Sequence, residues 1–182
     1  MITEIQGRKL RLLISAADIK AKVGEMGKRI TEDYRDKKPV FIGILKGGFI
    51  FLADLVREID FNVEIDFVKA SSYKEGMEPG EIELVTDVTA QLKGRHVLLV
   101  EDMLDTGITL HFLKSVILSK EPASLKICAL IDKKERRQID IEADYTGFEI
   151  REGFIVGYGT DWREAGRNLP GVYVVDEPGA KQ

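Results

Sequence analysis

The residues of this chain best suited to chemistry form a short run that follows an apolar segment. Glu101 and Asp102 come directly after the apolar residues 97–100, Asp105 follows, and residues 106–109 read Thr-Gly-Ile-Thr. An apolar segment of this kind predicts a central strand covered on both faces. The two adjacent carboxylates are therefore expected at the carboxyl end of a strand, where open α/β sheets bind their ligands.

The second half of this run predicts a phosphate site at the start of a helix. A helix N-terminus offers unpaired N–H groups and the positive end of a dipole, and Gly107 would let an anion approach the backbone closely. The hydroxyls of Thr106 and Thr109 can add hydrogen bonds, while Glu101 and Asp102 suit sugar hydroxyls or a hydrated Mg²⁺. The run indicates a site for a phosphorylated sugar and a metal. The alternative is that the carboxylates are solvated strand-end charges and Thr106 only caps the helix.

The elements that must position these residues alternate between helix and strand. Hydrophobic periodicity predicts helices over 15–36 (with Ser15 as N-cap), 47–58 and 110–117, and strands over 40–45, 63–68, 82–85, 96–100 and 125–131. Residues 71–80 lack periodicity and are expected to form an exposed loop. Strand, helix and strand in succession predict parallel crossovers, hence an α/β fold with a mostly parallel twisted sheet flanked by helices. Residues 132–182 are expected to be an appendage to this sheet.

Composition narrows the class of protein. The 182 residues suit one domain, and 44% of them are hydrophobic, which is enough for a real core. A net charge of −4 argues against a protein that coats nucleic acid or an anionic membrane. Cys128 is the only cysteine, so a disulfide framework and a multi-cysteine zinc site are excluded. No apolar stretch approaches the roughly 20 residues of a membrane span, and residues 1–6 lack signal-peptide features, so a cytoplasmic location is expected.

Residues 97–110 resemble the 5-phosphoribosyl-1-pyrophosphate (PRPP) binding signature of the type I phosphoribosyltransferases, and the resemblance extends over almost the whole chain. It implies a single phosphoribosyltransferase domain over 1–182, with a core at about 37–135 and a small hood from the N-terminal segment and about 150–182. It implies that PRPP and its 5′-phosphate are bound by Glu101, Asp102, Asp105, Thr106, Gly107, Ile108 and Thr109. Asp105 is the implied general base.

Four further segments are similar to the hypoxanthine-guanine branch of this family. In the first, Lys46 and Gly47 would hold the departing pyrophosphate with an unusual peptide geometry; the alternative is an ordinary strand-to-helix turn. In the second, Ser72 and Tyr73 would begin a mobile loop that closes over the reacting centre and excludes water. A flexible hairpin loop is the alternative there.

The third and fourth segments would form the purine pocket, whose implied residues are Lys133, Phe154, Ile155 and Asp161. The resemblance implies that Lys133 donates to the 6-oxygen of the base, that Phe154 stacks on the ring, and that backbone groups of Ile155 contact its edge. The alternatives are a solvated basic turn, since Arg136 and Arg137 lie close to Lys133, and a core aromatic at Phe154.

The same resemblance implies a metal and pyrophosphate site. Asp161 would help to hold Mg²⁺, with Glu101 and Asp102 as the other metal residues, and Arg167 would contact the pyrophosphate. The sequence departs from the family's pattern at Thr160, Trp162, Ala165 and Gly166, at the rim of the implied pocket, where changes bear on the exact base preference more than on the reaction.

The implied reaction converts PRPP and hypoxanthine or guanine to IMP or GMP and pyrophosphate, in a homodimer or homotetramer that binds neither nucleic acid nor membrane. A PRPP-binding regulator of the same fold is the first alternative. A phosphoacceptor receiver domain is the second, but too little chain follows residue 102 for its later strands. A transferase specific for adenine or a pyrimidine is the third, and Lys133 with Phe154 argues against it.

Overall fold

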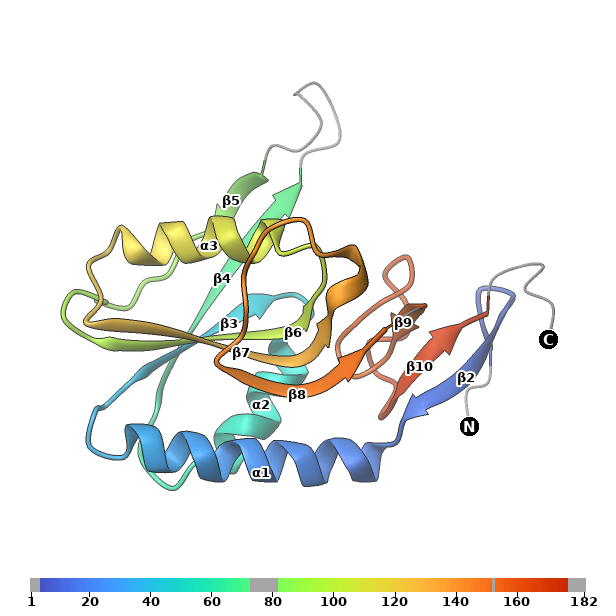
Figure 1. Ribbon diagram of the computed structural model, residues 1–182, viewed down its shortest axis with the longest axis horizontal. Helices are drawn as coiled ribbons and strands as arrows, with labels where there is room; N and C mark the ends of the chain where they lie inside the picture. Colours follow the sequence, from blue (N-terminus) through green and yellow to red (C-terminus); the bar gives the residue numbers. More distant parts are fainter. Residues whose placement is uncertain (1–3, 73–81, 152, 177–182) are drawn as a thin grey trace.

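A computed structural model describes residues 4–72, 82–151 and 153–176 and contains two sheets (Figure 1). The large sheet has the strand order β5-β4-β3-β6-β7-β8. Every neighbouring pair in it is parallel except β4 and β5, which are antiparallel. Its strands are β3 (Val40–Leu45), β4 (Glu64–Ser72), β5 (Ile82–Thr86), β6 (His96–Leu104), β7 (Ser124–Lys133) and β8 (Tyr145–Ile150). The predicted α/β class and the mostly parallel sheet are confirmed.

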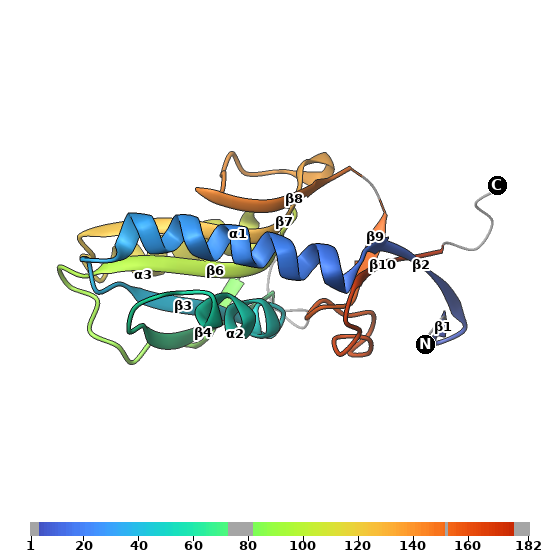
Figure 2. The ribbon, with the colours of Figure 1, turned by 90° about the horizontal axis from the view of Figure 1, so that it is seen from below.

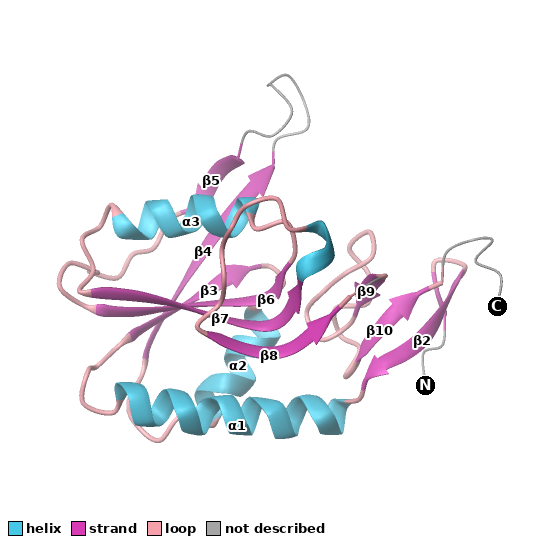
Figure 3. Cartoon of the chain, in the orientation of Figure 1, coloured by secondary structure: helices cyan, strands magenta, loops and turns pink. Residues whose placement is uncertain are grey.

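Helices cover both faces of this sheet (Figure 3). The first two, α1 (Ala16–Tyr34) and α2 (Phe49–Arg57), share one apolar cluster, and α3 (Ile108–Leu118) packs into a second cluster on the other face. The side chain of Ser15 accepts a hydrogen bond from the backbone N–H of Asp18 and caps α1, as predicted. The sheet is thus buried on both sides, which explains why its central strands are apolar throughout.

The central strand β6 is longer than expected. Residues 97–100 are fully buried, and the pairing with β7 continues past them, through Glu101 beside Ala129 to Leu104 beside Asp132. The expectation that Glu101 and Asp102 mark the end of the strand is therefore wrong. Because side chains alternate along a strand, the two carboxylates point to opposite faces of the sheet.

The second sheet is small, antiparallel and built from both ends of the chain. Its order is β1-β2-β10-β9, with β1 (Glu4–Ile5), β2 (Arg8–Ile14), β9 (Phe154–Val156) and β10 (Val172–Val175). It lies beyond the carboxyl ends of the large sheet's strands, and the view from below shows α1 reaching from one sheet to the other (Figure 2). This is the small hood expected from the chain-terminal segments.

Other boundaries also differ from the sequence predictions. The sixth strand β8 joins the large sheet beside β7, although residues 132–182 were expected to be an appendage. The range 37–135 also omits α1, which packs against that sheet. Ser71 and Ser72 belong to β4 because they pair with β5, so the loop expected over 71–80 cannot begin at Ser71. Tyr73 lies outside the described residues. No helix in the described ranges is long and apolar enough to cross a membrane.

Candidate active site

Two cavities open at the carboxyl ends of the central strands. We call them the α3 cavity, of about 220 Å³, and the Lys133 cavity, of about 360 Å³. The α3 cavity is lined by Ile44, Leu45, Ala70, Glu101, Met103, Leu104, Asp105, Thr106, Gly107, Thr109 and Leu110. The Lys133 cavity is lined by Lys46, Gly47, Asp102, Met103, Asp105, Lys133, Arg136, Phe154, Ile155, Thr160, Asp161 and Arg167. All but two of the predicted site residues described by the structure therefore line one cavity or the other; Ser72 and Ile108 line neither.

The α3 cavity is built around the start of α3. Gly107 caps this helix with a φ of 84°, a left-handed conformation that side chains other than glycine rarely adopt. A Cβ at Gly107 would also lie only 2.8 Å from the side chain of Ile141. The backbone N–H of Ile108 is turned to Thr106 Oγ1, at 3.4 Å. The arrangement is one that can bind an anion through a helix N-terminus and two threonine hydroxyls.

Arg137 supports this loop from behind. Its guanidinium donates to the backbone oxygens of Asp105, at 2.9 Å, and Leu104, at 3.4 Å, and it pairs with the buried carboxylate of Asp132. The alternative of a solvated basic turn does not hold for Arg137, because its side chain is only 16% exposed. The sequence carried one signal for this role, an arginine five residues after a strand-end aspartate.

The Lys133 cavity takes its purine-side residues from β7 and β9. Lys133 is 6% exposed, at the end of β7, and its Nζ donates to the backbone oxygen of Gly153 at 2.8 Å. The alternative of a solvated turn is thus wrong for Lys133. Phe154 is 41% exposed and meets the ring of Trp162 edge-on, with centroids 4.5 Å apart. A core aromatic would be buried, so Phe154 is not one, and its side chain lines the cavity.

The loop between β3 and α2 brings backbone against a carboxylate. The Leu45–Lys46 peptide bond is cis, so the unusual geometry expected in this loop is present. A Cβ at Gly47 would lie 2.1 Å from Asp102 Oδ2, and this close approach requires glycine. The backbone at Gly47 therefore packs directly against the side of β6 that carries Asp102.

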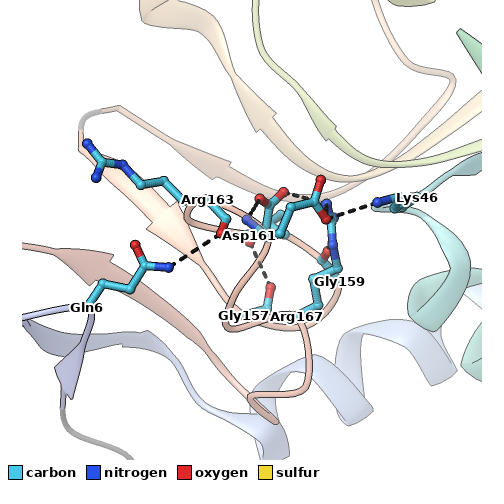
Figure 4. Close-up of polar contacts among 9 residues, drawn as sticks. Gln6, Lys46, Gly157, Gly159, Asp161, Arg163 and Arg167 are labelled. Atoms are coloured by element: carbon cyan, nitrogen blue, oxygen red, sulfur yellow. Dashed lines mark hydrogen bonds and ion pairs between the residues drawn. The ribbon is translucent and has the colours of Figure 1, made fainter. Parts of the chain in front are cut away.

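An ion pair joins this loop to the turn that follows β9, and further polar contacts lie within that turn (Figure 4). Arg167 Nη2 lies 2.7 Å from Asp161 Oδ1, and Arg167 Nη1 donates to the backbone oxygen of Gly159 at 2.8 Å. Lys46 Nζ lies 3.0 Å from Glu164 Oε2. The Lys46 ammonium, as hydrogen-bond donor and as charge, lowers the pKa of Glu164. Glu164 was not singled out from the sequence, where an exposed glutamate among polar residues carries no signal.

Asp105 has a special position, because it and Met103 are the two residues that line both cavities. Its Oδ1 atom is buried and has no hydrogen-bond partner among the described residues. Its Oδ2 atom lies 3.4 Å from Arg136 Nη1. One carboxylate oxygen is held by a cation while the other is free to accept a proton from a ligand.

The three carboxylates expected at a metal do not converge. Glu101 lines the α3 cavity, whereas Asp102 and Asp161 line the Lys133 cavity, and the described ranges hold no group of three or more acidic, histidine or cysteine side chains fit for a metal. Burial, together with the Asp102 carboxylate, raises the pKa of Glu101 well above its usual value. Mg²⁺ is commonly held by one or two carboxylates, waters and substrate phosphates. Asp102 and Asp161 fit such a site.

Comparisons with known proteins agree with this geometry. The family described as "Phosphoribosyl transferase domain" matches residues 15–163. The hypoxanthine-guanine phosphoribosyltransferase of Aquifex aeolicus is 49% identical over 96% of this chain and 99% of its own. That of Streptococcus pneumoniae is 46% identical, over 92% of this chain and 93% of its own. The crystal structure of a hypoxanthine phosphoribosyltransferase from Staphylococcus aureus superposes with a TM-score of 0.86 at 41% identity, covering 91% of each chain. The chain therefore belongs to the phosphoribosyltransferase family, in its hypoxanthine-guanine branch.

Proposed function

We propose that this protein transfers the ribose 5-phosphate group of PRPP to a ring nitrogen of hypoxanthine or guanine. The products would be IMP or GMP and pyrophosphate, which makes the reaction one of purine salvage. The observation that carries the proposal is the position of Asp105. This carboxylate, with one buried oxygen free, lines both a cavity at a helix N-terminus and a cavity that contains an exposed aromatic ring and a buried lysine.

PRPP would occupy the α3 cavity with its 5′-phosphate at the start of α3. The hydroxyls of Thr106 and Thr109 and the N–H groups beside Gly107 are the donors for that phosphate. Glu101 would accept hydrogen bonds from the sugar hydroxyls, since its carboxyl lines this cavity. Ile108 would contribute only through the backbone of this turn.

The purine would lie in the Lys133 cavity. The half-exposed ring of Phe154 offers a stacking surface, and the backbone beside Ile155 offers hydrogen bonds to the edge of the base. The Lys133 ammonium has three donors, of which one is directed at Gly153, so it can also donate to a 6-oxo group. A 6-amino group cannot accept from an ammonium, and the pocket therefore favours hypoxanthine and guanine over adenine.

Bond breaking at the sugar creates charge that this chain can stabilise. Negative charge grows on the departing pyrophosphate, where Lys46 and Arg167 supply cations and the backbone at Gly47 allows close approach. Bound Mg²⁺, held by Asp161 and Asp102, would neutralise further negative charge on the phosphate oxygens. The purine loses a proton from its imidazole ring, and Asp105 Oδ1 is the atom we assign to accept it.

The test is release of pyrophosphate from PRPP and Mg²⁺ with hypoxanthine, guanine, xanthine, adenine or orotate. Release with hypoxanthine or guanine, and none with adenine or orotate, is the expected result. Release with adenine would contradict the role given to Lys133. Binding of PRPP without turnover on any base would replace the proposal with that of a PRPP-binding regulator.

The assembly proposed for the protein is a homodimer or homotetramer. In the hypoxanthine phosphoribosyltransferase of Trypanosoma cruzi, a relative of known structure that is 36% identical, the C-terminal region is described as having a role in the oligomeric state and the activity. Light scattering of the purified chain, with and without PRPP, would test the assembly. A monomer under both conditions would contradict it.

A further inference from the structure

One carboxylate, that of Glu164, bridges the two cations that we assign to pyrophosphate. Its Oε2 atom lies 3.0 Å from Lys46 Nζ and 3.5 Å from Arg167 Nη2. Lys46 belongs to the loop after β3, whereas Glu164 and Arg167 follow β9, so the bridge spans segments far apart in the sequence (Figure 4). A single anionic oxygen thus stands where the proposed function requires a phosphate oxygen.

The turn that carries Glu164 does not depend on its side chain. The backbone N–H of Glu164 donates to Asp161 Oδ2 at 2.7 Å, and Trp162 and Ala165 exchange backbone hydrogen bonds of 2.9 and 3.0 Å. The Glu164 side chain is 68% exposed and makes its polar contacts only with Lys46 and Arg167 among the described residues. Because no other residue in the described ranges holds it, the carboxylate can turn out to solvent while the turn stays in place.

The charges that contact one another around Glu164 balance in the absence of a ligand. Two cations, Lys46 and Arg167, face two carboxylates, Asp161 and Glu164, with every ion pair at 3.5 Å or less. A pyrophosphate group brings several negative charges, and it can use both cations only after Glu164 has left them. Asp161 differs from Glu164 because it is 28% exposed and is the residue proposed to hold Mg²⁺.

We propose that Glu164 is a built-in competitor of pyrophosphate. Its carboxylate occupies Lys46 and Arg167 when the pyrophosphate group is absent, leaves them when PRPP binds, and returns as pyrophosphate departs. This inference deepens the proposed function and rests on it. The apparent affinity of a site that is only partly competent is reduced by the competent fraction. Glu164 therefore weakens pyrophosphate binding and favours release of this product.

Calorimetric titration of Mg²⁺-pyrophosphate into wild type, Glu164→Gln and Glu164→Ala tests the competition directly. Both variants are expected to bind pyrophosphate about 2- to 10-fold more tightly, because they lose an exposed ion pair and a like charge beside the ligand. The gain should shrink at high ionic strength, since exposed charges are screened. Stronger product inhibition by pyrophosphate in steady-state turnover is the kinetic counterpart.

Glu25→Gln is the matched control. Glu25 is also an exposed glutamate paired with a lysine, Lys22 at 2.6 Å, and it lines neither cavity. This variant is expected to keep wild-type pyrophosphate affinity and turnover. Thermal unfolding of each variant confirms that the fold is intact.

The outcomes separate this inference from the proposed function. Unchanged or weaker pyrophosphate binding in both Glu164 variants, with a wild type that binds pyrophosphate and turns over hypoxanthine, overturns the competitor role alone. A wild type that neither binds pyrophosphate nor turns over any base overturns both. Tighter binding in Glu164→Gln and Glu164→Ala, but not in Glu25→Gln, supports the inference.

Discussion

The α3 cavity takes most of its wall from one continuous stretch of chain, whereas the Lys133 cavity is assembled from five separate segments. Eight of the eleven residues that line the α3 cavity lie within 101–110, and Arg137 holds this stretch through hydrogen bonds to the backbone oxygens of Asp105 and Leu104. The Lys133 cavity instead joins the loop after β3 to segments from both sheets through exposed ion pairs such as Lys46–Glu164.

This difference separates a fixed site from an adjustable one. The donors at the start of α3 are backbone N–H groups, whose positions follow from the fold and from the conformation of Gly107, and the hydroxyls of the short side chains Thr106 and Thr109. The charges on the other side belong to long side chains that can exchange partners at small cost. A substrate that spans both cavities would be anchored at its phosphate and released at its pyrophosphate.

Asp105→Asn tests the residue that the two cavities share. An asparagine keeps the shape but cannot accept the purine proton, so we expect turnover to fall by about 10²- to 10⁴-fold. PRPP affinity should stay near that of wild type, because the phosphate donors are elsewhere. Stopped-flow turnover and equilibrium PRPP binding measure the two effects. Normal turnover would remove Asp105 from the role of base.

Arg137→Ala tests how the loop that lines the α3 cavity is held in place. Removal of this guanidinium leaves Asp132, 4% exposed, as a buried charge without its arginine, so we expect a loss of about 3–5 kcal/mol in the free energy of unfolding. The neighbouring Arg136→Ala supplies the control: its side chain is 58% exposed, and we expect a loss below about 1 kcal/mol. Urea unfolding measures both. Equal losses would mean that Arg137 does not anchor the loop.

The two cavities also differ in how far their residues can be predicted from the sequence. The α3 cavity was predictable because its residues are adjacent in the chain and their spacing is set by one strand-to-helix turn. The exception is the split of Glu101 from Asp102, which depends on how far β7 continues to pair with β6. The length of a strand is fixed by its partner, which a single segment of sequence does not show.

The residues of the Lys133 cavity could not be predicted from local sequence patterns alone. Lys133, Phe154 and Arg167 were expected from a family resemblance, since isolated lysines, phenylalanines and arginines carry no spacing signal. The bridge between Lys46 and Glu164 joins residues 118 positions apart and could not be found from the sequence. The place of β8 in the large sheet was missed for the same reason, because parallel pairing is a tertiary property.

Lys133→Met tests the part of the Lys133 cavity that is proposed to bind the purine. A hydrogen bond from a charged donor contributes about 1.5–3 kcal/mol, so we expect kcat/KM for hypoxanthine to fall by about 10- to 100-fold with PRPP affinity unchanged. Lys134→Met is the matched control, because Lys134 is 57% exposed and pairs with Glu149 at 3.0 Å. It should lose less than about 5-fold. Similar losses in both variants would assign the effect to general positive charge rather than to a buried donor.

Asp33→Asn supplies the baseline, since Asp33 lies on α1 and lines neither cavity. The Tyr145 hydroxyl, as the main cause, and Lys126 hold the pKa of Asp33 below its usual value. A carboxyl with a lowered folded-state pKa stabilises the protein above its unfolded pKa of about 3.9, and that stabilisation is lost as the pH falls through the folded value. Wild type should therefore exceed Asp33→Asn in free energy of unfolding by at most about 1 kcal/mol near neutral pH, because Asp33 is 39% exposed, and this difference should vanish in acid.

Pyrophosphate and PRPP binding by Asp33→Asn should be the same as in wild type at neutral pH. A gap that widens in acid would contradict the sign, and altered ligand binding would show that α1 is coupled to the adjustable side.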